Sequence, residues 1–121
     1  MASLHQVIST AYPFVSIRVD IRGHQYQGLA LLDTGFTGEL VVPRDLLSEE
    51  SGLPEEHTDW ELADGRVVDA PVYLGSLEIV GLPPITSVAV IALGTEYVLG
   101  RGVLDRFEVV FDHGKRVIVN L

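Results

Sequence analysis

Short stretches of alternating apolar and polar residues, separated by turns with glycine or proline, constrain the fold of this chain more than any other feature. From Val15 to Ile21 every second residue is apolar, and polar residues occupy the positions between them. This period of two is typical of a β-strand with one buried face. After an interruption at Gly23-His24, residues 26–32 form a second strand-like run. The two runs together predict a β-hairpin.

The rest of the chain continues this pattern of short strands. Asp64-Gly65 lies between two strand-like runs, which is a strong signal for a tight hairpin turn. Further strands are predicted at residues 39–42, 60–62, 67–73, 77–80, 85–93, 97–99, 109–111 and 117–119. Residues 55–59 are polar and predict a loop.

Only two stretches have helical features. Pro43 precedes residues 44–50 and Gly52 follows them, at positions where proline and glycine commonly begin and end helices. Residues 103–107 have apolar side chains at helical spacing. Many short strands with one or two short helices predict an all-β fold, either a small closed barrel or a sandwich. The sequence contains no linker and no internal repeat, so residues 1–121 are expected to form one domain.

The composition leaves one question open. Hydrophobic residues make up 47% of the 121 residues, and there are 12 glycines in addition, so the apolar share exceeds that of an average soluble domain. Burial in a subunit interface would explain this excess. A β-protein that is rich in valine and leucine and poor in lysine would explain it equally well.

Charge and residue types argue against several classes of partner and cofactor. With 8 basic and 17 acidic residues the formal net charge is −9, which disfavours binding to nucleic acid and to anionic membranes. The absence of cysteine excludes disulfides and thiolate chemistry. The four histidines lack the spacing of metal ligands. No metal or other cofactor is therefore expected.

The sequence has no segment that predicts export or membrane insertion. Residues 1–20 lack the basic and apolar regions of a signal peptide. Residues 79–93 form the longest uncharged stretch, which is too short to span a bilayer and includes Pro83-Pro84. A soluble, cytoplasmic protein is therefore expected.

One short motif carries the clearest chemical signal. The apolar pair Leu31-Leu32 leads directly into Asp33-Thr34-Gly35. A strand at this place delivers a carboxylate to the edge of an apolar environment, while a hydroxyl can hold the loop and glycine permits a tight turn. Aspartate and glycine are also common in ordinary turns, so this motif alone does not decide between a turn and a catalytic site.

A second motif follows later in the chain. It consists of Val98-Leu99-Gly100-Arg101, followed by Val103-Leu104. Together with the Asp33 motif it resembles the retropepsin-like (retroviral-type) aspartic proteases, in particular their small bacterial single-domain members. The resemblance runs from about Phe14 to the end of the chain, where residues 107–121 match a terminal hairpin.

The resemblance implies an active site that two copies of the chain share. Such proteases use two aspartates, and this chain has one Asp-Thr-Gly motif, so a homodimer with one Asp33 from each subunit is expected. Two carboxylates held this close repel each other and share one proton. The ionised one would take a proton from a water molecule that attacks a peptide bond, and the protonated one would donate to the carbonyl oxygen.

The resemblance also implies roles for residues around the aspartate. The threonine of the motif, Thr34 here, hydrogen-bonds across the aspartate pair, and Gly35 places its backbone against the site. Ala63-Asp64-Gly65 would form the tip of a flap that covers an extended polypeptide substrate. The residues that support the first motif would be Leu99, Gly100 and Arg101.

Departures from the family pattern leave other hypotheses open. Phe36 and Thr37 stand where retroviral members have alanine and aspartate, and they are expected at the substrate pocket. Gly102 replaces an acid or amide. Arg101 normally pairs with the acid that Thr37 replaces, so it needs another partner, for which Glu39 is a candidate. The alternative hypotheses are a retropepsin-like module that dimerises and binds peptides but cuts weakly or not at all, and a latent monomer.

Overall fold

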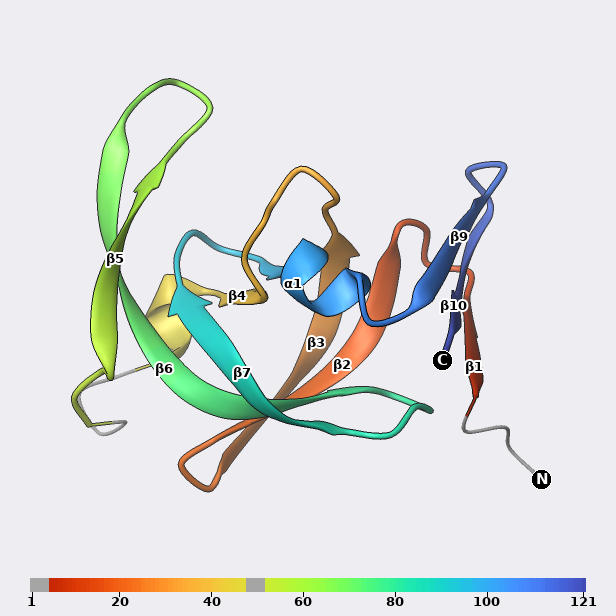
Figure 1. The fold of residues 1–121 in the computed structure, drawn as a ribbon, viewed down its shortest axis with the longest axis horizontal. Coiled ribbons are helices and arrows are strands. Elements are labelled where there is room, and N and C mark those ends of the chain that lie inside the picture. The colour runs from red at the N-terminus through yellow and green to blue at the C-terminus, as the bar shows by residue number, and fades with distance from the viewer. Residues whose placement is uncertain (1–4, 48–51) are drawn as a thin grey trace.

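The computed structural model describes residues 5–47 and 52–121, and strands dominate these parts of the chain (Figure 1). The strands are β1 (Gln6–Ser9), β2 (Phe14–Ile21), β3 (His24–Leu32), β4 (Leu40–Val42), β5 (Glu56–Glu61), β6 (Val67–Ile79), β7 (Ile85–Ala92), β8 (Tyr97–Leu99), β9 (Glu108–Asp112) and β10 (Arg116–Asn120). The helices are the single 3-10 turn η1 (Arg44–Leu46) and the short α1 (Arg101–Leu104). No helix in the described ranges is long and apolar enough to cross a membrane.

Six of the strands close into a barrel. The hydrogen-bonded order is β2-β3-β8-β4-β7-β6, and β6 pairs back with β2. Closure leaves these strands without the unpaired edges that promote aggregation. β5 lies outside this ring and pairs only with β6. The prediction of an all-β fold with a closed barrel is confirmed.

The barrel interior follows from the alternation in β2. Val15, Ile17, Val19 and Ile21 are all at most 1% exposed, and they pack in one core with residues such as Leu99. Full burial of a side chain of this size contributes about 1.5–3 kcal/mol. The period of two in the sequence therefore identifies the inner face of the barrel.

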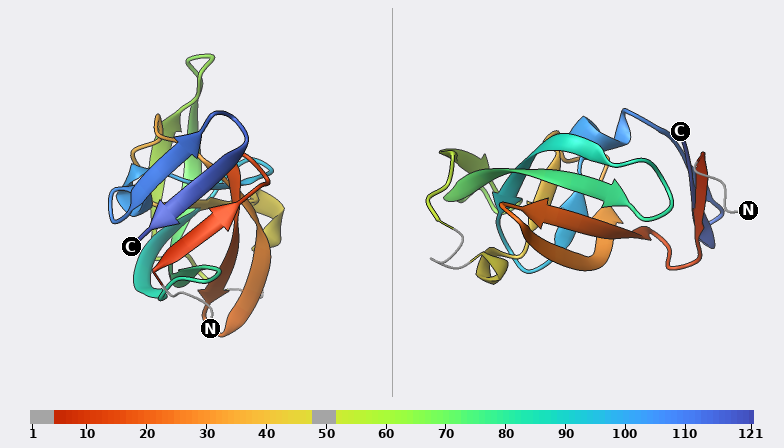
Figure 2. Two further views of the ribbon diagram at one scale, coloured as in Figure 1. Left: turned by 90° about the vertical axis from the view of Figure 1, so that its right-hand side faces the viewer. Right: turned by 90° about the horizontal axis from the view of Figure 1, so that it is seen from below.

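A second, three-stranded sheet joins the two ends of the described chain. Its order is β1-β10-β9, all antiparallel, and it lies across one end of the barrel, opposite the end where β5 projects (Figures 1 and 2). Val117 and Val119 are fully buried against the barrel core. On the other face, Ile8, Ile118 and Val110 stand side by side in register.

Four local predictions were wrong in detail. The helical stretch predicted at 103–107 begins and ends earlier, as α1 at Arg101–Leu104. Residues 55–59 were predicted as a loop, but β5 begins at Glu56; its side chains alternate only between exposed and half-buried because it lies outside the barrel. The helix predicted at 44–50 is reduced to η1, and residues 48–51 lie outside the described part of the chain. The predicted strands 67–73 and 77–80 are one continuous strand, β6.

Candidate active site

Asp33 follows directly after β3 and is held by the neighbouring strand. β3 and β8 are parallel, with Leu32 opposite Leu99. The Asp33 backbone N–H donates to the Leu99 carbonyl oxygen at 3.0 Å. Leu99 is fully buried in the barrel core. The residue that carries the carboxylate is thus anchored to the centre of the fold, while its own side chain remains half-buried at the barrel end.

The loop after Asp33 folds back on the aspartate. The Gly35 N–H donates to the Asp33 Oδ1 at 2.9 Å, and the Phe36 N–H donates to the Asp33 carbonyl oxygen at 3.3 Å. A Cβ on Gly35 would lie 3.2 Å from Oδ1, so glycine lets the backbone approach the carboxylate. Thr34 and Thr37 are exposed. The carboxylate is therefore oriented by its own loop.

The second sequence motif packs against the back of this loop. The N–H groups of Gly100, Arg101 and Gly102 donate to the carbonyl oxygens of Glu39, Phe36 and Gly38, at 3.0, 2.8 and 3.0 Å. A Cβ on Gly100 would collide with the Gly38 carbonyl oxygen and with the Phe36 ring. The two motifs that are distant in the sequence thus form one hydrogen-bonded unit, and Gly100 is needed for its close approach.

The candidate partner of Arg101 is wrong. Glu39 pairs instead with Arg106, at 3.8 Å, and its Oε1 accepts the Ala89 N–H at 3.0 Å. The Arg101 side chain is exposed and forms no ion pair within the described ranges. Arg106 lies just beyond α1, and nothing in its local sequence marks it as the partner of Glu39. Through its bond to Ala89, Glu39 links the Asp33 loop to β7.

The hairpin of β5 and β6 rises beside the Asp33 loop (Figure 1). At its tip the Leu62 N–H donates to the Arg66 carbonyl oxygen at 2.7 Å, and Gly65 adopts a positive φ of 86°. The Asp64 carboxylate accepts the Arg66 N–H at 3.0 Å and pairs with Arg66 Nε at 2.7 Å. These backbone and side-chain bonds lower the pKa of Asp64 below its ordinary value of 3.8. The hairpin predicted around Asp64-Gly65 is present.

Phe36 connects the Asp33 loop to the base of this hairpin. Its ring packs against Trp60 with 5.1 Å between centroids and a tilt of 59°. Trp60 is oriented by a hydrogen bond from its Nε1 to Thr58 Oγ1, at 2.7 Å. Both aromatic rings lie on a small apolar cluster with Val41 and Val72, separate from the main barrel core. The hairpin base and the aspartate loop therefore share one packing unit.

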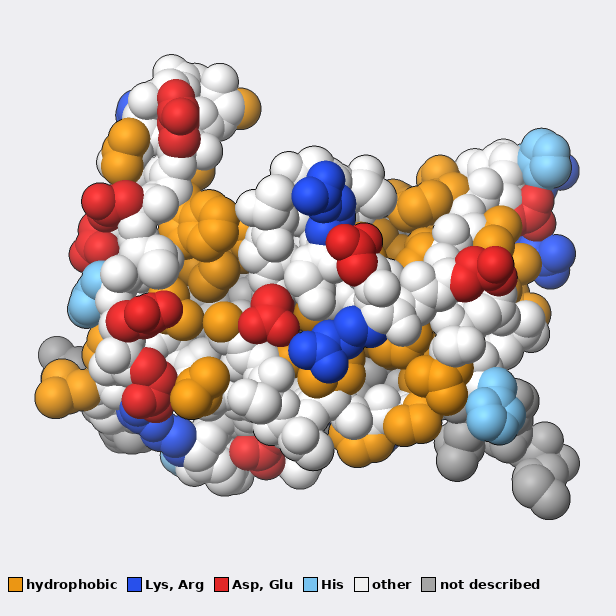
Figure 3. Space-filling model, viewed as in Figure 1, with side chains coloured by type: hydrophobic (Ala, Val, Ile, Leu, Met, Phe, Trp, Pro, Cys, Tyr) orange, Lys and Arg blue, Asp and Glu red, His pale blue; other side chains and the backbone are white. Residues whose placement is uncertain are grey.

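A groove of about 490 Å³ lies between the hairpin and the Asp33 loop. In Figure 3 it is the hollow beside the projecting hairpin, with hydrophobic side chains at its base. Four sequence-predicted residues line it: Asp33, Gly35, Phe36 and Ala63. Leu99, Gly100 and Arg101 lie behind the loop, and Thr34, Thr37, Asp64 and Gly65 are close in sequence but are not among the lining residues.

Several lining residues were not identified from the sequence. Leu93 and Glu96 come from the connection between β7 and β8, Val98 from β8, Glu61 from the end of β5, and Leu62 from the turn that follows it. Val98 belongs to the second sequence motif, but that motif did not mark it as a groove residue, and the other four belong to no recognisable motif. Leu93, Glu96 and Val98 reach the groove because β8 pairs with β3, which places this connection beside Asp33. Glu61 and Leu62 reach it through the β5–β6 hairpin.

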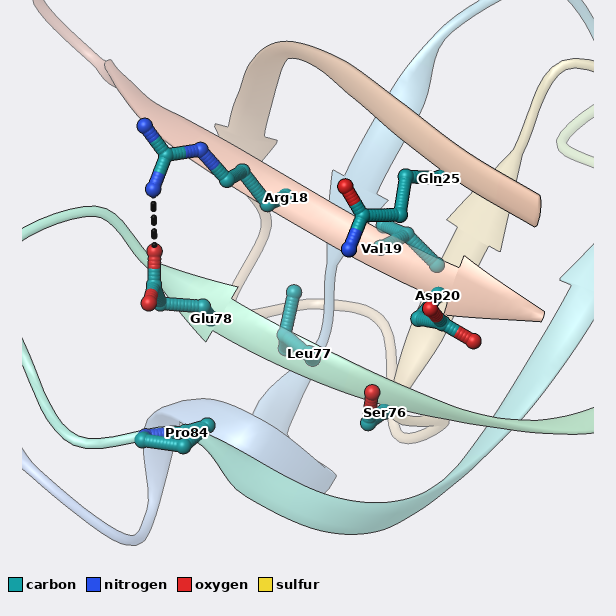
Figure 4. A pocket seen from close by; sticks show the side chains of 8 residues that line it. All are labelled: Arg18, Val19, Asp20, Gln25, Ser76, Leu77, Glu78 and Pro84. Carbon is teal, nitrogen blue, oxygen red and sulfur yellow. Dashed lines mark hydrogen bonds and ion pairs between the residues drawn. The ribbon is translucent and has the colours of Figure 1, made fainter. Parts of the chain in front are cut away.

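A second pocket, of about 340 Å³, lies on the barrel wall between β2 and β6 (Figure 4). Its polar residues include Arg18 and Glu78, which form an ion pair at 3.0 Å, and Asp20. It contains none of the sequence-predicted site residues. Within residues 5–47 and 52–121, no group of three or more histidine or acidic side chains is placed to hold a metal ion.

Comparison with known proteins identifies the fold. No protein-family model matches the chain, and no curated protein matches it. Among solved structures, a retropepsin-like aspartic protease from Rickettsia conorii is similar over 95% of this chain and 90% of that one, with a TM-score of 0.64 and 17% identity. This chain has a retropepsin-like fold. The protease of simian foamy virus (mac) is also similar, over 74% of this chain and 91% of that one, with a TM-score of 0.50 and 20% identity.

The retropepsin-like fold confirms the expectation drawn from the two motifs. The similarity to the Rickettsia structure extends over nearly the whole chain. Both similar structures are described as proteases.

Proposed function

We propose that this protein is an aspartic endopeptidase that acts as a homodimer, with one Asp33 from each subunit. The observation that carries this proposal is the placement of Asp33. Its carboxylate is oriented by the Gly35 N–H, its backbone is anchored to the fully buried Leu99 of β8, and it lines a groove. The likeness to two solved proteases in fold supports the same conclusion.

The arrangement of the subunit favours a two-fold dimer. The Asp33 loop, the tip of the β5–β6 hairpin and the β9–β10 turn all lie along one edge of the molecule, the upper edge in Figure 1. Phe111, near the end of β9, is 40% exposed and packs edge-on against Tyr12 at 6.1 Å. An isologous contact along this edge would bring the two Asp33 loops face to face.

The chemistry of such a pair follows from electrostatics. Two carboxylates about 4 Å apart repel by about 4 kcal/mol at an effective dielectric constant of 20, so the pair holds one proton between them. The ionised Asp33 takes a proton from a bound water, whose oxygen bonds to the peptide carbonyl carbon. The protonated Asp33 donates to the carbonyl oxygen. The resulting tetrahedral species breaks its C–N bond as the nitrogen takes up a proton, and no covalent intermediate with the enzyme forms.

Neighbouring groups have supporting roles in this proposal. Thr34 hydrogen-bonds across the pair, and the Gly35 N–H keeps the carboxylate in position. The β5–β6 hairpin acts as a flap that covers an extended polypeptide and excludes bulk water, with Ala63 facing the groove. Substrate side chains alternate between the two sides of the groove, as in added β-strands.

A second candidate function is peptide binding without efficient cleavage. The observation in its favour is the bulky Phe36 beside the catalytic loop, where it packs against Trp60 and occupies room next to Asp33. The exposed Arg101, which has no acidic partner within the described residues, points the same way, because the loop lacks the usual ion pair behind it.

The test is cleavage of a diverse mixture of unfolded peptides by the wild type and by Asp33→Asn, read by mass spectrometry from acid to neutral pH. The proposal predicts cuts by the wild type alone, while circular dichroism shows both proteins folded. Equal cutting by both proteins contradicts it. Peptide binding by both proteins without any cutting would support the second candidate instead.

A further inference from the structure

The groove beside Asp33 carries an unusual balance of charge. Its titratable lining residues are Asp33, Glu61 and Glu96, and no lysine, arginine or histidine is among the residues that line it. This groove is therefore negative, even before the charge of a second subunit is added.

The two glutamates differ from three other glutamates that the structure describes. Glu39, Glu55 and Glu78 each pair with an arginine. Glu61 and Glu96 are exposed and form no ion pair within the described residues. An unpaired carboxylate at the rim of a partly enclosed groove attracts a cation more strongly than one on an open surface.

The two glutamates belong to different walls of the groove. Glu61 ends β5 on the hairpin side, and Glu96 lies in the connection from β7 to β8. The groove surface beside them is apolar and aromatic, with Trp60, Phe36 and Leu93. A lysine or arginine side chain matches this surface, because its methylene stem packs on apolar groups while its charged end stays near carboxylates and solvent.

We infer that this groove selects polypeptide segments that place a lysine or arginine side chain in it, and that Glu61 and Glu96 determine this specificity. The inference rests on the proposed function and names its substrate class. An acidic residue at the same position is rejected, because it would meet two carboxylates without a compensating cation.

The test uses three peptides that are identical except at one position, which is lysine, glutamine or glutamate. The peptide sequence is taken from a site that the wild type cuts. If the wild type cuts none, the peptide is built around a large apolar residue. Binding is measured by fluorescence anisotropy with Asp33→Asn, which retains both glutamates, and cleavage is measured with the wild type. Each of the two carboxylates, Glu61 and Glu96, is expected to favour binding of the lysine peptide over the glutamine peptide by about threefold, so that both together give a preference of about tenfold. The preference should shrink at high salt.

Variants distinguish an effect of the two groove glutamates from an effect of the net charge of the protein. Glu61→Gln and Glu96→Gln, each made in the Asp33→Asn protein, should reduce the lysine preference, and the double change should remove it. Glu78→Gln alters the net charge equally but lies in the pocket on the barrel wall, so it should leave the preference unchanged.

The outcomes distinguish this inference from the proposed function. Equal binding of the three peptides, or no binding of any, overturns the inference, and cutting by the wild type would then leave the proposed function intact. A lysine preference that Glu78→Gln removes as strongly as Glu96→Gln also overturns it. A lysine preference that depends on Glu61 and Glu96, in a protein that cuts nothing, supports the inference and contradicts the proposed function.

Discussion

The two sides of the groove are built in opposite ways. On one side, the Asp33 loop is tied to the barrel by backbone hydrogen bonds: the Asp33 N–H donates to Leu99, and the loop carbonyl oxygens accept from Gly100 and the start of α1. On the other side, the bonds that hold the tip of the β5–β6 hairpin in the described part of the chain all lie within its own turn, chiefly those between Asp64 and Arg66. The Asp33 loop is therefore held by bonds to the barrel, whereas the hairpin tip is held by bonds within its own turn.

This difference suits a small chain that must hold a carboxylate in a fixed position and also cover the groove with an element that can open. A reacting carboxylate needs support from rigid, buried elements, and Asp33 receives it from a strand in the barrel core. A covering element needs few buried contacts so that it can open. The contact between Phe36 and Trp60 links the two sides at the base of the hairpin, so in the proposed function it marks the base of the flap.

The largest effect is expected from adding one methyl group on the rigid side. Gly100→Ala would drive its Cβ into the Gly38 carbonyl oxygen and the Phe36 ring. Overpacking of this kind lowers the free energy of unfolding by about 1–3 kcal/mol, and displacement of the loop should also reduce cleavage. Urea denaturation and peptide cleavage would measure the two effects.

The matched change on the other side is Gly65→Ala. The position is open, but its φ of 86° is strained for alanine, so we expect a loss of about 1 kcal/mol with amide exchange altered only at the tip. A Gly100→Ala protein as stable and as active as the wild type would contradict the proposed rigidity of the loop.

A smaller effect is expected where the two sides meet. Trp60→Leu removes the aromatic contact with Phe36, and a double-mutant cycle with Phe36→Leu should give a coupling of about 0.5–1.5 kcal/mol. Hydrogen exchange of β5 amides should accelerate, while that of β3 and β8 stays unchanged. Faster exchange throughout the barrel would show that the hairpin base belongs to the main core and not to a separate unit.

A smaller change again is expected behind the loop. Arg106→Gln breaks a partly exposed ion pair with Glu39, and such pairs contribute about 0.2–1 kcal/mol. Arg101→Gln removes an equally positive side chain that forms no ion pair in the described structure, and it should leave the isolated subunit as stable as the wild type. Thermal unfolding at a concentration where the protein is monomeric would compare them. A greater loss with Arg101→Gln would contradict the assignment of Arg106 as the partner.

The smallest effect concerns pH at the hairpin tip. Bonds from the Arg66 N–H and guanidinium lower the pKa of Asp64, so the ionised carboxylate supports the folded tip. This support is complete above the unfolded value of 3.8 and is lost as the pH falls through the lower, folded pKa. An NMR titration should give Asp64 a pKa below 3.8 and show the Arg66 amide resonance shifting in the same range. An Asp64 pKa at or above its ordinary value would contradict this assignment.

Much of the rigid side could be predicted from the sequence. The alternation in β2 identifies the barrel interior, and the apolar residues before Asp33 and Gly100 identify two strands whose last residues, Leu32 and Leu99, are buried in the core. These signals are local, because a strand shows its buried face in its own residues. The resemblance in two motifs pointed to Asp33 and Gly100, and the structure places these two motifs in hydrogen-bonding contact.

The opposite wall of the groove could not be predicted in the same way. β5 lies outside the barrel, so it has no buried face to produce an alternating pattern. Glu96 and Leu93 reach the groove only through the pairing of distant strands. The ion pair of Glu39 with Arg106 also depends on where α1 ends in space, which no local pattern encodes.

The central claim is that two Asp33 carboxylates from two subunits form one catalytic centre. Its most direct test is to mix wild type with Asp33→Asn, unfold and refold them together, and measure cleavage at a fixed total concentration. If only dimers with two aspartates are active, an equal mixture retains about one quarter of the wild-type activity. Retention of about one half, the value for subunits that act independently, would contradict the claim.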